Sequence, residues 1–337
     1  MRNHAVDIFR GIAILIMVTA NSYSYFFSNI SCPIGIRVLF SSAAPIFIFM
    51  SGVSLRLSEE NGKSIYKTIK RIFQIVFFAV LIDVLIWEIL PFYTMDVLYL
   101  ISFSLIILLI LRKLPDYFAL IVFALINLLT LLFSPYYIFD LVELSIFSVY
   151  EDYNFLTSVS QTFIGGWFPV FPWIGISLLG YYTAKHRFVL SKFSRSFLVT
   201  GLIGFLGFLY LTIEGIFSFN LPRSSYMEIF YPVTFPFFAF MISIFLILFY
   251  FIVKNSLKFK FLKLCGTYSL AVYFFHVVLI KFYLPIFDLE NQEVSLGERL
   301  VIFSSLFLLI FSHVLFLFWF ERKTGKSYPF LKFLLGV

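Results

Sequence analysis

The first apolar segment, residues 7–28, carries an acid, a base and an amide in a stretch long enough to cross a bilayer. A helix turns by about 100° per residue, so Asp7, Arg10 and Asn21 fall on one face, in line with Ile14 and Met17. The stripe runs for about 21 Å along the axis. Polar side chains in a membrane helix usually face a protein interior or a wet cavity. The pattern therefore predicts a polar track that enters from one side and ends deep in the membrane.

His276 is the histidine with the most polar companions in a membrane segment. Ser269 and Tyr273 precede it at spacings that place all three on one helix face. His276 lies about as deep in its segment as Asn21 does, so the two side chains could meet. The imidazole could serve as a general base near neutral pH, or it could be a structural hydrogen-bonding group.

The polar groups of the first segment also allow two readings. Asp7 and Arg10 could form an ion pair at the helix end, or Arg10 could bind the phosphates of a cofactor, with Arg71 at the same mouth. Asn21 could hold two helices together, or it could donate to a developing oxyanion. Asp83 could be an acid on the substrate side, or it could reach the membrane interface.

The composition excludes a single soluble core. Hydrophobic residues make up 61% of the 337-residue chain and charged residues only 13%, whereas soluble domains are about 45–50% apolar. The net charge of +7 does not indicate nucleic acid, because the basic residues sit in short loops between apolar runs. No Walker loop, dinucleotide fingerprint or serine elbow is present. The two cysteines and four histidines show no metal-ligand spacing, so we predict no metal site.

The apolar runs predict an all-α, polytopic membrane protein with about ten transmembrane helices. Each run is close to the length that spans a bilayer, about 20 residues. The predicted helices cover residues 7–28, 34–56, 66–88, 95–112, 117–134, 167–185, 196–214, 231–253, 263–284 and 300–320.

Lysine and arginine positions predict the orientation. If both termini are cytoplasmic, the inner loops hold all but four of the 25 basic residues, as the positive-inside rule requires. The outer side then holds Arg37, Arg223, Lys281 and Arg299. We expect a multi-pass protein of the plasma membrane that forms a single domain over residues 1–337. The long outer connection, about 135–166, is expected to contain an amphipathic helix at the interface, either as a lid or as padding.

Several segments together resemble the heparan-α-glucosaminide N-acetyltransferase family of membrane acyltransferases. Residues 7–21 resemble the first helix of that family, and residues 44–52 resemble its second. Residues 266–276 resemble its late Gly-x-x-Ser-Leu-x-x-Tyr-x-x-His helix, and residues 168–175 resemble a segment of its prokaryotic members.

The resemblance implies acyl transfer from cytoplasmic acetyl-CoA, or another acyl-CoA, to a sugar or glycan on the far side. It implies that Asp7 and Arg10 lie on the cofactor side, that Asn21 lies at the reacting centre, and that His276 lies in the inner polar core; Ser269 and Tyr273 belong with the cofactor-binding residues. Membrane lipids and a second copy of the chain are the other expected partners.

One departure from the family pattern concerns the catalytic base. Members commonly carry a histidine soon after the asparagine, but Ser22 to Ile36 contains none, and Cys32 lies near that place. His276 could take over the role, or Cys32 could carry the acyl group as a thioester. The departure also leaves open a second class of function, namely a non-enzymatic transporter or a structural subunit of a membrane complex.

Overall fold

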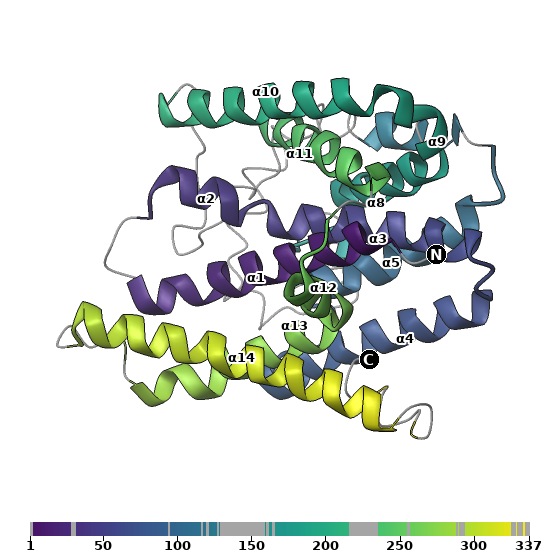
Figure 1. Cartoon of the computed structure of the whole chain (residues 1–337). Helices are drawn as coiled ribbons and strands as arrows, with labels where there is room; N and C mark the ends of the chain where they lie inside the picture. Colours follow the sequence, from purple (N-terminus) through teal and green to yellow (C-terminus); the bar gives the residue numbers. More distant parts are fainter. Residues whose placement is uncertain are drawn as a thin grey trace. The chain divides into compact units, whose positions relative to one another are not determined.

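The structure is a computed structural model of the whole chain, shown in Figure 1. It describes residues 3–27, 32–93, 95–115, 166–215, 235–254, 257–287 and 294–324, and also 117–118, 121–126, 128, 159, 162–163, 289, 328 and 333. The predicted outer connection at 135–166 and most of the predicted helix at 117–134 lie outside the described residues.

The described residues form helices and no strand, so the chain is all-α. The bounds of the regular elements are α1 His4–Phe27, α2 Ile34–Phe40, α3 Ala43–Glu60, α4 Ile65–Leu81, η1 Ile82–Trp87, α5 Val97–Leu111, α8 Val170–Lys185, α9 Arg187–Leu190, η3 Ser191–Phe193, α10 Ser194–Ile213, α11 Phe235–Lys254, α12 Lys260–Thr267, α13 Ser269–Val278, η4 Leu279–Tyr283, η5 Leu284–Phe287 and α14 Leu296–Thr324.

Polar side chains fix where several helices begin. At the start of α1, the Asn3 side chain accepts a hydrogen bond from the backbone N–H of Ala5, at 3.1 Å. At the start of α14, Ser295 and Glu298 cap each other's backbone: Glu298 Oε2 accepts from the N–H of Ser295 at 2.8 Å, and Ser295 Oγ accepts from the N–H of Glu298 at 3.3 Å. These capping hydrogen bonds position the first turns of two long apolar helices.

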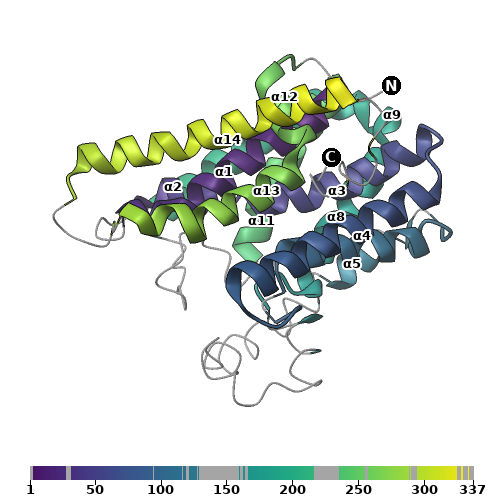
Figure 2. The ribbon, with the colours of Figure 1, turned by 90° about the horizontal axis from the view of Figure 1, so that it is seen from below.

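The chain divides into two compact units. The terminal unit comprises Arg2–Ala43, Ser225–Glu228 and Ser256–Val337, and the central unit comprises Ala44–Ser224 and Ile229–Asn255, with Met1. In the terminal unit, α1 packs against α12, α13 and α14, as Figure 2 also shows. In the central unit, α4 packs on α5, α5 on α8, and α10 on α11. The single domain predicted over residues 1–337 remains a prediction.

Five helical segments of the described residues are long and apolar enough to cross a membrane: His4–Tyr23, Ile34–Glu60, Arg187–Ile213, Ser269–Phe287 and Leu296–Thr324. This is fewer than the ten predicted. Shorter apolar helices cover Val97–Leu111 and Ala239–Lys254, and α8 has 16 residues. The apolar helices make this a membrane protein, whereas ten crossings and cytoplasmic termini remain predictions.

Two of the predicted helices are interrupted. The run predicted at 34–56 divides into α2 and α3, because the chain turns at Ser41 and Ser42, whose hydroxyls bond back to the carbonyls of Arg37 and Leu39. The run predicted at 263–284 divides at Tyr268, which has φ −100° and ψ 22°. Two π-helical segments, η1 and η4, also replace regular α-helix. Such segments are frequent at functional sites.

Candidate active site

Asn21 on α1 and His276 on α13 contact each other in the terminal unit. The Asn21 Nδ2 atom lies 3.2 Å from His276 Nε2, although the residues are 255 positions apart. His276 is completely buried, whereas Asn21 is partly exposed. The similar depths of the two residues in their segments led us to expect this proximity.

The hydrogen bonds of His276 indicate one tautomer. An amide NH₂ group can only donate, so His276 Nε2 must accept and carry no proton. The other ring nitrogen, Nδ1, lies 3.3 Å from the carbonyl oxygen of Val272 and therefore carries the proton that it donates there. A backbone carbonyl that holds the Nδ1 proton fixes the ring and leaves the Nε2 lone pair directed at Asn21. This is the state that a general base requires.

Tyr273 and Ser269 lie on the same helix as His276. The Tyr273 ring packs edge-on against the imidazole, with the ring centroids 5.1 Å apart. Both Tyr273 and Ser269 are buried. The break at Tyr268 lies one residue before Ser269, where α13 begins, so the three residues still share one short helix. The Tyr273 contact limits the rotation of the imidazole and keeps it in reach of Asn21.

Glycines bring α12 into close contact with the first half of α1. A Cβ atom added to Gly266 would lie 1.7 Å from the carbonyl oxygen of Asp7, and one added to Gly11 would lie 1.9 Å from the carbonyl oxygen of Leu262. No side chain fits at either position, so the two backbones pack directly, as small residues allow between membrane helices. Because α13 continues from α12 with a single-residue break, this crossing also sets where His276 meets α1.

Asp7 and Arg10 occupy this crossing. Their carboxylate and guanidinium are 3.9 Å apart, Asp7 is buried, and the Arg10 side chain is 27% exposed. The geometry agrees with the ion-pair reading, and the exposed fraction leaves Arg10 accessible to an anion. On the same helix, Ser22 donates to the carbonyl of Val18 at 2.7 Å, so its hydroxyl is bound within α1.

Arg299 is a residue of this unit that sequence reasoning missed. It is 9% exposed, its Nη1 donates to the carbonyl of Phe26 at 2.8 Å, and its Nε donates to the carbonyl of Val294 at 3.2 Å. Phe26 is in the last turn of α1, where carbonyls lack helical partners and favour a cation. Arg299 thus ties the end of the Asn21 helix to α14. In the sequence, Arg299 could have been singled out because it is one of only four basic residues predicted to lie on the outer side.

Other predicted site residues lie elsewhere. Arg71 and Asp83 belong to the central unit. Arg71 Nη1 donates to Gln74 Oε1 at 2.6 Å. Asp83 is 1% exposed, so its side chain is enclosed by protein. Its Oδ2 accepts from the Tyr99 hydroxyl at 2.7 Å and from the N–H of Phe92 at 3.2 Å.

Cys32 lies between α1 and α2 and is partly exposed. Burial raises the pKa of the Cys32 thiol above its ordinary value, although a hydrogen bond with Tyr23 and the charge of Arg37 act in the opposite direction. A raised pKa leaves little thiolate at neutral pH, and the thiolate is the nucleophile. Among the described residues, no group of three His, Cys, Asp or Glu side chains could hold a metal ion.

A family model described as heparan-alpha-glucosaminide N-acetyltransferase, catalytic, matches residues 2–213. That match covers more than half of the chain. The chain belongs to the heparan-alpha-glucosaminide N-acetyltransferase family. The matched region contains Asp7, Arg10 and Asn21, whereas His276 lies beyond it. No curated protein and no solved structure matches the chain. Family membership indicates a membrane acetyltransferase, and the donor and the acceptor are matters for proposal.

Proposed function

We propose that this protein is a plasma-membrane acyltransferase that moves an acetyl or acyl group from cytoplasmic acyl-CoA to a sugar or glycan at the outer face. Family membership supports the reaction class. The observation that carries the proposal is the hydrogen bond between Asn21 and His276, because it pairs an amide donor with an unprotonated imidazole nitrogen. The proposal includes ten membrane crossings with both termini in the cytoplasm, as the basic residues predict.

In this proposal the acyl donor enters at the Asp7–Arg10 end of α1. The partly exposed guanidinium of Arg10 binds phosphate oxygens of the cofactor, which is the pairing that arginine favours. The thioester end then extends along the polar face of α1 towards Asn21, beside the buried Ser269 and Tyr273.

The chemical step is a direct transfer between the two substrates. A hydroxyl or amine of the acceptor attacks the thioester carbonyl and loses its proton to His276 Nε2. The Asn21 amide donates to the carbonyl oxygen as negative charge develops there. The carbon–sulfur bond then breaks, and the CoA thiolate leaves with the proton that His276 returns. The products are an acyl ester or amide and free CoA, and the histidine is neutral again.

Cys32 is not the acyl carrier in this scheme. Its raised pKa disfavours the thiolate that a thioester intermediate requires. We propose Cys32 for the acceptor side only, and separately propose Asp83 as an acid of the central unit that is held by its hydrogen bond from Tyr99.

A non-enzymatic role is the second candidate, as a transporter or as a subunit of a membrane complex. The observation that favours it is the absence of a histidine between Ser22 and Ile36, where family members commonly carry one. A chain that kept the scaffold but lost catalysis would still hold Asn21 and His276 together as a structural pair.

The test uses purified protein in lipid nanodiscs with radiolabelled acetyl-CoA and a panel of hexosamines and glycans. We expect time-dependent transfer of label to at least one sugar, and calorimetric binding of acetyl-CoA. His276→Ala should lower the transfer rate by about 10²–10⁴-fold, the usual contribution of a general base, while acetyl-CoA binding persists. Absence of both transfer and acetyl-CoA binding would favour the non-enzymatic role.

A further inference from the structure

The break at Tyr268 separates α12 from α13 in the terminal unit. Tyr268 has φ −100° and ψ 22°, and α13 begins at the next residue. Backbone hydrogen bonds continue on both sides of the break: the N–H of Tyr268 donates to the carbonyl of Leu264, and the N–H of Val272 donates to the carbonyl of Tyr268, each at 3.0 Å. The dihedral angles of this one residue therefore set the direction in which α13 leaves α12.

The direction of α13 decides whether His276 reaches Asn21. The close contact of Gly266 with the Asp7 backbone fixes the end of α12 against α1. His276 comes eight residues after Tyr268, which is about 12 Å along a helix. A change of about 10° in the direction of α13 would move His276 by about 2 Å. Such a movement is enough to open the 3.2 Å contact between Asn21 Nδ2 and His276 Nε2.

The side chain of Tyr268 is bound to α14. Its ring is buried, and its hydroxyl donates to Oε2 of Glu321, in the last turn of α14, at 2.5 Å. A hydrogen bond to a carboxylate is roughly twice as strong as one between neutral groups. Earlier in α14, the His313 ring stacks on Phe275, the residue before His276, with the ring centroids 4.2 Å apart. Thus α14 holds α13 at the break and again beside His276.

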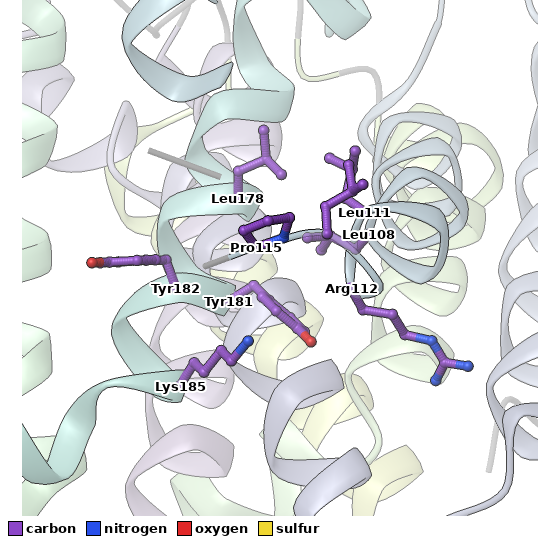
Figure 3. A pocket seen from close by; sticks show the side chains of 9 residues that line it. Leu108, Leu111, Arg112, Pro115, Leu178, Tyr181, Tyr182 and Lys185 are labelled. Carbon is purple, nitrogen blue, oxygen red and sulfur yellow. The ribbon is translucent and has the colours of Figure 1, made fainter. Parts of the chain in front are cut away.

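A tyrosine–glutamate bond of the central unit has a different setting. Tyr181 of α8 donates to Glu59 of α3 at 2.7 Å and lines a pocket that encloses about 20 Å³, room for about one water molecule (Figure 3). Glu59 also forms an ion pair with Arg112, at 3.3 Å. Within the described part of the chain, Tyr268 is the one hydrogen-bond partner of the Glu321 side chain. Loss of the tyrosine hydroxyl would therefore leave Glu59 paired but would release Glu321 from α12 and α13.

We propose that Tyr268 and Glu321 are positioning residues, whose hydrogen bond sets the direction of α13 and holds His276 at Asn21. The inference rests on the proposed function, because its effect on catalysis requires His276 to be the general base. Both residues act through His276. Without their bond, α13 keeps its backbone hydrogen bonds but loses its tether at the break, so the imidazole moves away from the amide. The chain then still binds acetyl-CoA but transfers the acyl group more slowly.

The first measurement is the rate of acyl transfer by the full chain in nanodiscs. Tyr268→Phe removes the hydroxyl, Glu321→Leu removes the acceptor, and Glu321→Gln keeps an oxygen that can accept. We expect kcat to fall about tenfold in Tyr268→Phe and in Glu321→Leu, as for the loss of one charged hydrogen bond. The KM for acetyl-CoA should be unchanged, and Glu321→Gln should recover part of kcat. Since Glu321 is partly exposed, its variants test the same bond if Tyr268→Phe does not fold.

Tyr283→Phe is the matched control. The Tyr283 hydroxyl lies 2.7 Å from Ser305 Oγ, so it also ties the chain after α13 to α14, but beyond His276 and away from the break at Tyr268. Its removal should leave kcat close to that of the wild type.

The second measurement does not depend on acyl transfer. Nitrogen NMR of the full chain with isotope-labelled histidine reports the hydrogen bond at His276 Nε2, and His276→Gln identifies this signal among the four histidines. We expect the Nε2 signal to shift in Tyr268→Phe and in Glu321→Leu, because the Asn21 contact is lost. It should stay in place in Tyr283→Phe.

Three results would overturn the proposal. The first is an Nε2 signal that stays in place in Tyr268→Phe and Glu321→Leu. The second is a shifted signal with unchanged kcat. The third is an equal loss of kcat in Tyr268→Phe and Tyr283→Phe, which would indicate general packing against α14. If the wild type transfers no acyl group, the proposed function fails, and the NMR signal alone then decides whether Tyr268 and Glu321 position His276.

Discussion

At the scale of single residues, the central feature is an imidazole whose two nitrogens have different partners. Val272 holds the proton on His276 Nδ1, and Asn21 occupies Nε2. A substrate must displace or share the Asn21 contact to reach the lone pair of His276 Nε2. The amide and the imidazole therefore contact the same part of the substrate. This is why the two residues are best tested together.

Cys32 gives a prediction about pH. Because burial raises the pKa of this thiol, we expect slow alkylation at neutral pH and a rate that keeps rising above the ordinary thiol pKa of about 8.5. Iodoacetamide labelling in a Cys265→Ala background, followed by mass spectrometry between neutral and alkaline pH, measures this. Cys32→Ala should retain acyl transfer. Rapid labelling at neutral pH, together with loss of transfer in Cys32→Ala, would restore the thioester reading.

Arg299 gives a second prediction at this scale. It acts through Asn21, as a positioning residue, because it binds the carbonyl of Phe26 five residues further along α1. Arg299→Gln should lower kcat about tenfold, as for the loss of one charged hydrogen bond, with little change in the KM for acetyl-CoA. Arg299→Lys should recover part of kcat. A change confined to KM, or equal melting and activity losses in both variants, would indicate a purely structural role.

At the scale of elements, the sequence predicted where helices lie better than where they break. The segment expected at 7–28 is α1, His4–Phe27, because apolar length and a polar cap both mark it. The breaks at Ser41–Ser42 and at Tyr268 fall inside continuous apolar runs, where serine and tyrosine are ordinary helix residues. The break at Tyr268 follows directly on the close contact of Gly266 with the Asp7 backbone, a tertiary contact that no local pattern predicts. The burial of Asp83 has the same origin, since its partner Tyr99 comes from the next helix.

The crossing of α1 and α12 gives a prediction about stability. Gly266→Ala forces a methyl group into the Asp7 carbonyl, so the two helices must separate. We expect a loss of about 1–3 kcal/mol, the usual cost of overpacking, seen as a lower melting temperature in detergent. Gly207→Ala on α10 is the matched control, because its added Cβ would meet nothing within 4 Å. Equal melting temperatures for the two variants would show that the close crossing is absent.

At the scale of the whole molecule, the apolar composition and the family agree on a membrane protein. Composition alone excluded a soluble fold, and the motifs around Asp7, Asn21 and His276 indicated the family that the match over residues 2–213 shows. The ion pairs of Glu59 with Arg112 and of Glu60 with Arg187 could not be predicted in this way, because both arginines come from the ends of other helices. Only Arg56, which lies in α3 itself, is at helical spacing from the two glutamates.

The membrane topology is the prediction at this scale. Reporter fusions after Gly215 and after Lys254, on either side of α11, should face opposite compartments. Alkaline phosphatase should be active after Gly215, and a cytoplasmic fluorescent reporter should be bright after Lys254, because basic residues gather on that side. If both fusions reported the same compartment, α11 would not cross the membrane, and the predicted ten-helix topology would be wrong.

Asn21 and His276 act as one reacting centre in the proposed reaction, and a double-mutant cycle on acyl transfer tests this directly. Rates are measured for Asn21→Ala, His276→Ala and the double variant, with acetyl-CoA binding as the control for folding. We predict that each single variant loses about 10²-fold or more, and that the double variant is hardly slower than His276→Ala, because residues that act as a unit are not additive. Full transfer in either single variant, or losses that simply multiply, would contradict the account.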